Sequence, residues 1–213
     1  MLHKTTVAEP TLGMIKSLCS LPEISDFYLV GDTALSLQIG HRRSIDIDFF
    51  TNDSFNALQL HDVLADKFNF KRLYVEKNTL KGTINEVFVD FITHKYPLCE
   101  SLIIEEGVRM ASMADIAAMK INAIIGSGER LKDFVDISYL GSRLTLHKMM
   151  KAYHQKYGND QSVIILKALL YFDDINYDVK IDTMDKGFSI ELMKKRIERM
   201  CQNPDKLLPE KYI

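Results

Sequence analysis

Several features that would place a protein in a specialised class are missing from this sequence of 213 residues. No apolar stretch approaches the roughly 20 residues that cross a bilayer. The stretch Met1–Glu23 has no uninterrupted apolar segment and contains Glu9 and Lys16, so it does not read as a signal peptide. The formal net charge is only -2, so the surface as a whole is not built to coat nucleic acid. These absences predict a cytoplasmic protein.

Patterned cysteines are also missing, because Cys19, Cys99 and Cys201 are far apart and form no zinc-binding spacing. We expect them to be reduced thiols. Internal repeats and low-complexity tracts are absent too. What remains is a composition typical of globular proteins, with 46% hydrophobic and 26% charged residues, in a length that suits one large domain or two small ones.

The first half of the sequence mixes strand and helix patterns. Helices are expected over 10–21, 33–39 and 56–68, and strands over 27–30, 44–50, 71–76, 79–84 and 87–92. The last three strands are joined by tight turns at Lys77–Asn78 and Asn85–Glu86. In the strand over 44–50, Ile45, Ile47 and Phe49 are expected to share one face, opposite the acidic side chains.

After Pro97 the pattern is helical to the end. Ser112 and Asp115 resemble a capping box at the start of a helix that continues to residue 125. Further helices are expected over 131–140, 145–157, 160–172 and 189–200. The sequence therefore predicts an α+β domain over 1–100 and a helical domain over 101–213.

Two aspartates one residue apart, Asp46 and Asp48, form a D-x-D motif. On one strand their carboxylates share a face about 7 Å apart, which suits one hard cation or a close pair of cations. Asp90 adds a third acid on a later strand, between Phe88 and Ile92, and an acid in that apolar setting needs a partner or a metal ion. Such carboxylates hold the metal ions of phosphoryl and nucleotidyl transfer. The motif alone is also common by chance on a solvated face.

A glycine turn at Gly31 comes before the short helix that leads to the D-x-D motif. The N-terminus of such a helix can receive phosphate, with Gly31 allowing close backbone approach and Thr33 offering a hydroxyl. The alternative is a plain turn from strand to helix in which Thr33 is the N-cap. The combination of glycine turn, D-x-D strand and later strand aspartate favours the functional interpretation.

The order of these features resembles the DNA polymerase β-type nucleotidyltransferase superfamily. More narrowly, FYLVGDTALSLQIGHRRSIDIDFF followed by SMADIAAMKINAIIGSGERLKDFVDISYL resembles the AbiEii/AbiGii toxin family of nucleotidyltransferases. The resemblance covers about residues 25–175 and implies a mixed β-sheet flanked by helices, followed by a helical domain. It also implies an enzyme dependent on Mg²⁺ or Mn²⁺ that moves a nucleotide from a nucleoside triphosphate to an acceptor. The acceptor implied is RNA, such as the tRNA 3′ end, and the setting implied is a toxin–antitoxin or phage-defence system with a cognate antitoxin.

The resemblance also assigns roles to residues. It implies that Asp46, Asp48 and Asp90 bind metal, and that Gly31, Asp32 and Thr33 lie in the loop around the triphosphate. It adds Lys120 and Asp133 as catalytic residues, with Lys120 also bound to the triphosphate. Arg43, with Arg42 beside it, is a further candidate for binding phosphate or RNA.

The residues outside the strand aspartates and the glycine turn can also be explained without a catalytic role. Lys120 is then a surface lysine that extends to solvent, Asp133 and Asp136 form ion pairs on a helix surface, and Arg42 and Arg43 are solvated loop charges.

One residue departs from the family pattern, because Asp32 stands where Gly or Ser is usual. A carboxylate repels a triphosphate unless it turns away or meets a metal ion. Because of Asp32, a second hypothesis is that the chain is a non-catalytic relative of the family that binds a nucleotide or a protein. A third is a small-molecule nucleotidylase, which the near-neutral charge fits at least as well as an RNA-modifying enzyme.

Overall fold

The computed structural model describes residues 1–158 and 161–210. The chain forms two compact units. The first consists of Met1–Gly40, Ser44–Pro97 and Ser101–Ala111. The second consists of His41–Arg43, Leu98–Glu100 and the residues from Ser112 onward. Each unit therefore contains residues from both sides of position 100.

Among the described residues, no helix has both the length and the apolar character that crossing a membrane requires.

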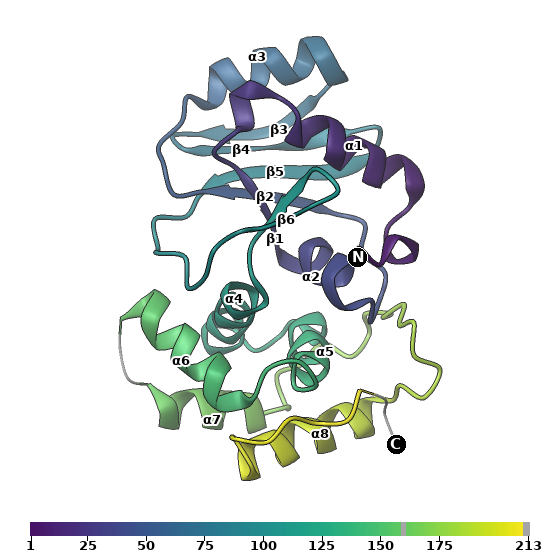
Figure 1. Cartoon of the computed structure of the whole chain (residues 1–213), viewed down its shortest axis with the longest axis vertical. Coiled ribbons are helices and arrows are strands. Elements are labelled where there is room, and N and C mark those ends of the chain that lie inside the picture. The colour runs from purple at the N-terminus through teal and green to yellow at the C-terminus, as the bar shows by residue number, and fades with distance from the viewer. Residues whose placement is uncertain (159–160, 211–213) are drawn as a thin grey trace. The chain divides into compact units, whose positions relative to one another are not determined.

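The first unit is built around a seven-stranded mixed sheet with the strand order β3-β4-β5-β2-β1-β7-β6 (Figure 1). Its elements are η1 (Lys4–Thr6), α1 (Glu9–Cys19), η2 (Pro22–Ile24), β1 (Tyr28–Val30), α2 (Gly31–Ile39), β2 (Ile47–Thr51), α3 (Ala57–Phe68), β3 (Lys71–Glu76), β4 (Thr79–Ile84), β5 (Val87–Thr93), β6 (Ile103–Glu105) and β7 (Val108–Met110). β2 runs parallel to β5, and β7 runs parallel to β1. The other neighbouring pairs are antiparallel.

Side chains alternate across the two central strands, β2 and β5. Ile47, Phe49, Val89 and Phe91 are fully buried, and the rings of Phe49 and Phe91 stack with centroids 5.4 Å apart. This apolar face continues onto β4, which α3 covers (Figure 1). The opposite face carries Asp48 and Asp90 and is called the carboxylate face below. The alternation of apolar and acidic residues thus separates a core from a chemically polar surface.

Most elements of the first unit agree with the sequence-based prediction, and the strands 71–76, 79–84 and 87–92 are confirmed to within one residue. The expectation of only helices after Pro97 was wrong, because β6 and β7 form a hairpin and join the sheet. Its turn at Glu106–Gly107 has positive φ at both residues, as a two-residue hairpin turn requires. Strands of three residues are too short to show a clear period-two pattern.

The second unit is helical, as expected. Its helices are α4 (Met113–Gly126), α5 (Leu131–Leu140), α6 (Leu146–Tyr157), α7 (Ser162–Leu170) and α8 (Ile190–Gln202). The start expected at Asp160 for the fourth helix lies outside the described residues. The α+β class is therefore confirmed, with a mixed sheet flanked by helices and a following set of helices.

Ser112 begins α4 as predicted, since its hydroxyl oxygen accepts a hydrogen bond from the Asp115 N–H at 3.0 Å. The carboxylate of Asp115 also makes contacts that are not part of a capping box. It pairs with the Lys156 ammonium at 2.7 Å and accepts the backbone N–H of Cys99 at 2.9 Å. Burial by itself raises the pKa of Asp115, but Lys156 and these hydrogen bonds outweigh it and lower that pKa. Asp115 thereby fastens residues 98–100 to the helices of the second unit.

Close packing at Gly82 of β4 gives a test of the first unit. A Cβ atom there would lie 2.3 Å from Cζ of Phe70 and 2.4 Å from the backbone oxygen of Lys71. Because that oxygen belongs to the paired strand, Gly82→Ala should lower the free energy of unfolding by about 1–3 kcal/mol. Gly13, on the exposed side of α1, has no atom within 4 Å of such a Cβ. Gly13→Ala is therefore the matched control and should raise stability by about 0.5–1 kcal/mol. Denaturant titration of both variants measures the difference, and equal effects would contradict the packing at Gly82.

Candidate functional site

Asp48 and Asp90 are direct neighbours in the sheet of the first unit. β2 and β5 run parallel with Asp48 paired to Asp90, and both side chains are partly exposed on the carboxylate face. The acids therefore lie opposite their buried neighbours, as the strand pattern predicts. Two carboxylates on adjacent strands present hard oxygen donors to the same volume, which is the donor set that Mg²⁺ and Mn²⁺ prefer.

Asp46 lies just before β2, which begins at Ile47. The prediction that Ile45 shares a face with Ile47 and Phe49 was wrong, since those two are fully buried and Ile45 is 67% exposed. The backbone at Asp46 is nevertheless fixed, because the Thr33 hydroxyl donates a hydrogen bond to its carbonyl oxygen. Thr33 also lies 2.9 Å from the hydroxyl of Ser44. Asp46 is thus held at the entrance to β2 rather than within a regular strand.

Gly31 brings the start of α2 against the Asp48 carboxylate. It has φ +67°, and a Cβ atom on it would lie 2.9 Å from Oδ2 of Asp48. A side chain at this position would therefore be strained and would also press on the carboxylate. The alternative in which Thr33 is the N-cap was wrong, because the helix begins at Gly31 and Val30 is its N-cap. Asp32 is buried in the first turn of α2, where the positive end of the helix dipole favours a carboxylate.

Lys81 is a residue of this surface that the sequence analysis missed. Its ammonium lies 2.6 Å from Oδ2 of Asp90, to which it is paired in register across β4 and β5. The sequence places Asp90 in an apolar setting, but its neighbour Phe88 is 54% exposed and Asp90 has this cation beside it. The signal was present, since the predicted turn at Asn85–Glu86 pairs Ile84 with Val87 and therefore Lys81 with Asp90.

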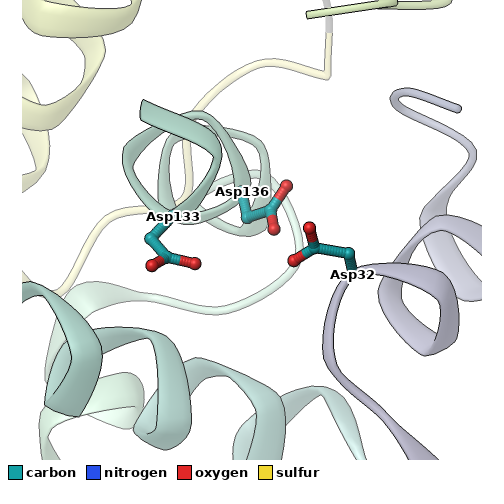
Figure 2. Close-up of side chains that lie close together, drawn as sticks. All are labelled: Asp32, Asp133 and Asp136. Carbon is teal, nitrogen blue, oxygen red and sulfur yellow. The ribbon is translucent and has the colours of Figure 1, made fainter. Parts of the chain in front are cut away.

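Lys120 and Asp133 meet in the second unit. The Lys120 ammonium on α4 lies 2.7 Å from Oδ1 of Asp133 and 2.7 Å from Oδ2 of Asp136. Figure 2 shows the carboxyl groups of Asp133 and Asp136 projecting from the same helix, α5. Lys120 is only 5% exposed, so the alternative of a lysine that extends to solvent was wrong. The pairing of Lys120 with Asp133 links the two residues that the resemblance picked out in this half of the chain.

Asp136 is the centre of this buried network. Oδ1 accepts hydrogen bonds from Nε2 of His41 at 2.8 Å and from Nε of Arg42 at 2.6 Å, and Oδ2 accepts from Nη2 of Arg42 at 2.9 Å. Burial by itself raises the pKa of Asp136, but the charges of Lys120 and Arg42 and these hydrogen bonds hold it well below its usual value. A helix-surface ion pair was therefore the wrong alternative for Asp136, which is fully buried.

Arg42 and Arg43 differ in their surroundings. Arg42 is 1% exposed and binds Asp136 through two nitrogen atoms, so the alternative of a solvated loop charge was wrong for Arg42. Arg43 is 60% exposed and lies 3.4 Å from a carboxylate oxygen of Asp182. Arg43 is therefore the member of the pair that remains open to an anionic ligand.

Sequence comparison finds one clear relative among curated proteins. The chain is 33% identical to the uncharacterized protein aq_aa25 of Aquifex aeolicus (strain VF5) over 199 residues, which cover 89% of this chain and 95% of that protein. The chain belongs to the same family as aq_aa25. No family model matches the sequence.

Solved structures with a similar fold include a nucleotidyltransferase. The MenT4 nucleotidyltransferase toxin Rv2826c of Mycobacterium tuberculosis H37Rv superposes with a TM-score of 0.55 at 13% identity, over 90% of this chain and 84% of that chain. JHP933 from Helicobacter pylori superposes with a TM-score of 0.50 at 16% identity, over 92% of each chain. The family of aq_aa25 therefore shares its fold with a nucleotidyltransferase.

The environment of His41 predicts a pH dependence of stability. Burial lowers the pKa of His41, which contacts Asp136 and the ring of Tyr139. The Asp136 carboxylate opposes this shift, and the charges of Arg42 and Lys120 add to it. The unfolded chain therefore binds a proton at His41 below about pH 6.5, before the folded chain does. The contribution of His41 to stability is complete above that pH and is lost as the pH falls toward the lowered pKa.

Denaturant titration at pH 7.5 and 5.5 tests this dependence. His41→Gln keeps an N–H donor for Asp136 but cannot titrate, so its free energy of unfolding should fall less between the two pH values than that of the unmodified chain. His147, whose side chain is 66% exposed, provides the control. His147→Gln should retain the full dependence, and a His41→Gln variant with an unchanged pH dependence would contradict the assignment.

Proposed function

We propose that this chain is a nucleotidyltransferase that moves a nucleotide from a nucleoside triphosphate to an acceptor hydroxyl. The observation that carries the proposal is the pairing of Asp48 with Asp90 on adjacent parallel strands, with the Gly31 backbone packed against Asp48. The shared fold with MenT4, a nucleotidyltransferase toxin, supports it. In the reaction, the acceptor oxygen bonds to the α-phosphorus, the bond to the bridging oxygen breaks, and pyrophosphate leaves.

The residues present fit a divalent metal ion. Their donors are carboxylate oxygens, and the absence of a side chain at Gly31 leaves room beside Oδ2 of Asp48 that a Cβ would fill. Asp46, Asp48 and Asp90 are the residues that would hold the ion. Bound Mg²⁺ or Mn²⁺ would neutralise charge on the phosphates and lower the pKa of the acceptor hydroxyl.

The protein residues supply binding and proton transfer. The backbone N–H groups at the start of α2, including those of Gly31 and Thr33, would receive phosphate oxygens. Asp90 takes the acceptor proton as a general base or serves as a metal ligand. From the resemblance, Lys120, Asp133 and Arg43 contribute to catalysis and triphosphate binding. Asp32 would contact base, sugar or metal.

The acceptor and the biological setting are further parts of the proposal. The resemblance to the AbiEii/AbiGii family supports an RNA acceptor, such as the tRNA 3′ end, and a cytoplasmic toxin that a cognate antitoxin controls. A small-molecule acceptor remains the alternative within the same reaction class, because the near-neutral net charge gives no general attraction to RNA.

A non-catalytic relative of the fold is the second candidate. Two observations favour it, namely the carboxylate of Asp32 in the first turn of α2 and the pairing of Lys120 with two buried carboxylates. Asp32 and Lys120 are both residues expected at the triphosphate site, and here each interacts with other parts of the protein instead. In this reading the chain binds a nucleotide or a protein without turnover.

Transfer from radiolabelled nucleoside triphosphates separates these functions. The full chain is incubated with each α-labelled triphosphate and Mg²⁺, with total RNA, purified tRNA or a small-molecule extract as acceptor. We expect label on one acceptor class, no transfer in EDTA, and recovery when Mg²⁺ or Mn²⁺ is restored in excess. Asp48→Asn should reduce the rate at least about a hundredfold, because it removes a charged ligand.

The matched control is Asp66→Asn, which changes an exposed aspartate on α3 and should leave transfer unchanged. If transfer continues at an unchanged rate in Asp48→Asn and Asp90→Asn, the strand carboxylates do not take part in the reaction. Triphosphate binding without transfer to any acceptor would support the non-catalytic relative.

A further inference from the structure

The carboxylate face continues from the acids toward the β3 edge as a surface of aromatic and basic side chains. Tyr74, Lys81, Asp90 and Asp48 form one row in register across β3, β4, β5 and β2. In the adjacent row, Phe88 on β5 is paired with Thr83 on β4. Tyr74 is 48% and Phe88 54% exposed, although both are large and apolar. The aromatic rings thus lie on the same sheet face as the acids.

We propose that Phe88 and Lys81 form the binding surface for an unpaired end of a nucleic-acid acceptor. This inference rests on the proposed nucleotidyl transfer and specifies its acceptor as single-stranded RNA. A base stacks on the ring of Phe88, and the Lys81 ammonium contacts a phosphate of the same strand. Tyr74, in the same row as Lys81, extends the surface toward the β3 edge.

The position of Phe88 supports this assignment. It lies two residues before Asp90 on the same strand and the same face, so a nucleotide stacked on its ring lies about 7 Å along the strand from that carboxylate. A base on Phe88 would therefore present a neighbouring ribose hydroxyl toward the acids. Exposed aromatic rings on a β-sheet are a common platform for unpaired bases.

The charge at Lys81 supports the same ligand. Its side chain is 41% exposed while its ammonium holds Asp90 at 2.6 Å. An ammonium has three N–H donors, so contact with Asp90 is compatible with contact to a phosphate oxygen. Lys71, an exposed residue on β3, adds a second positive charge in the row of Phe88, with Thr83 between the two.

A protein partner fits this surface less well. The residues around Phe88 are polar, with Thr83 opposite it and Lys81 and Asp90 each two residues away along their strands. Protein-binding surfaces usually have a continuous apolar centre from which charged residues are depleted. An exposed ring with a lysine and a carboxylate near it suits a base with its phosphate better.

Fluorescence anisotropy of the full chain with a labelled, mixed-sequence oligoribonucleotide tests the proposal in EDTA, without triphosphate. Single strands should bind more tightly than the same sequence as a duplex. Phe88→Leu should weaken single-strand binding about tenfold, whereas Phe88→Tyr, which keeps a ring, should stay within about twofold. Lys81→Gln should weaken binding and make the plot of log affinity against log salt shallower by about 0.7.

Two substitutions elsewhere in the first unit, one of them on β6 at the sheet edge opposite β3, serve as controls. Ile104→Ala changes a residue that is 70% exposed on β6, and Lys67→Gln changes an exposed lysine on α3. Both should bind the oligonucleotide like the unmodified chain. Thermal unfolding of every variant shows whether the fold is intact.

Unchanged affinity of Phe88→Leu, or equal binding of single strand and duplex, would overturn the proposal. The proposal would also be overturned if Phe88→Leu changed only the self-association of the chain, measured by light scattering. This face would then be a contact between copies of the chain. Oligonucleotide binding that depends on Phe88 without nucleotidyl transfer would refute the proposed reaction alone. Transfer to RNA with an unchanged KM in Phe88→Leu would refute this surface alone.

Discussion

The parallel pairing of β2 with β5 is the constraint on which the first unit depends. It sets Asp48 beside Asp90 on strands about 4.8 Å apart, where two like charges repel by about 3 kcal/mol at the effective dielectric constant of a protein surface. The Lys81 ammonium offsets part of this repulsion from the next strand. The buried residues Ile47, Phe49, Val89 and Phe91 hold the two strands together in spite of it.

Two of the charged clusters in this protein differ in how far they are buried. In the second unit, the carboxylate of Asp136 is fully buried and surrounded by His41, Arg42 and Lys120. Breaking such a buried network by removing one partner is strongly destabilising. On the carboxylate face, Asp48 and Asp90 are partly exposed, and the cation beside Asp90 is Lys81, whose side chain is 41% exposed. The carboxylate face is therefore accessible to solvent, whereas the cluster around Asp136 is enclosed by the protein.

The sequence was sufficient to predict strands and turns whose residue patterns are local. Alternation and turn residues located β3, β4 and β5, and the register that follows from the turn at Asn85–Glu86 is enough to imply the contact of Lys81 with Asp90. The hairpin of β6 and β7 was not predictable by the same method because each strand has three residues. Its signal was the Glu106–Gly107 turn between short apolar pairs.

Contacts between distant segments could not be predicted from patterns. Arg42 binds Asp136 from 94 positions away, and nothing in the local sequence around either residue indicates the other. The resemblance identified Lys120 and Asp133, but it supplied no information on the arginine and the histidine that neutralise the adjacent Asp136. Such residues become visible only once the fold brings their segments together.

The interleaving of the two units determines how the protein can be divided. A fragment that begins after residue 100 keeps α4 to α8 but loses His41, Arg42 and the segment 98–100. Asp136 would then lose its contacts with His41 and Arg42, and Asp115 would lose the backbone N–H groups of Cys99 and Glu100. The helical half is therefore not a transferable module. Chimaeras of this protein with its relatives should carry residues 41–43 and 98–100 from the same parent as the helices.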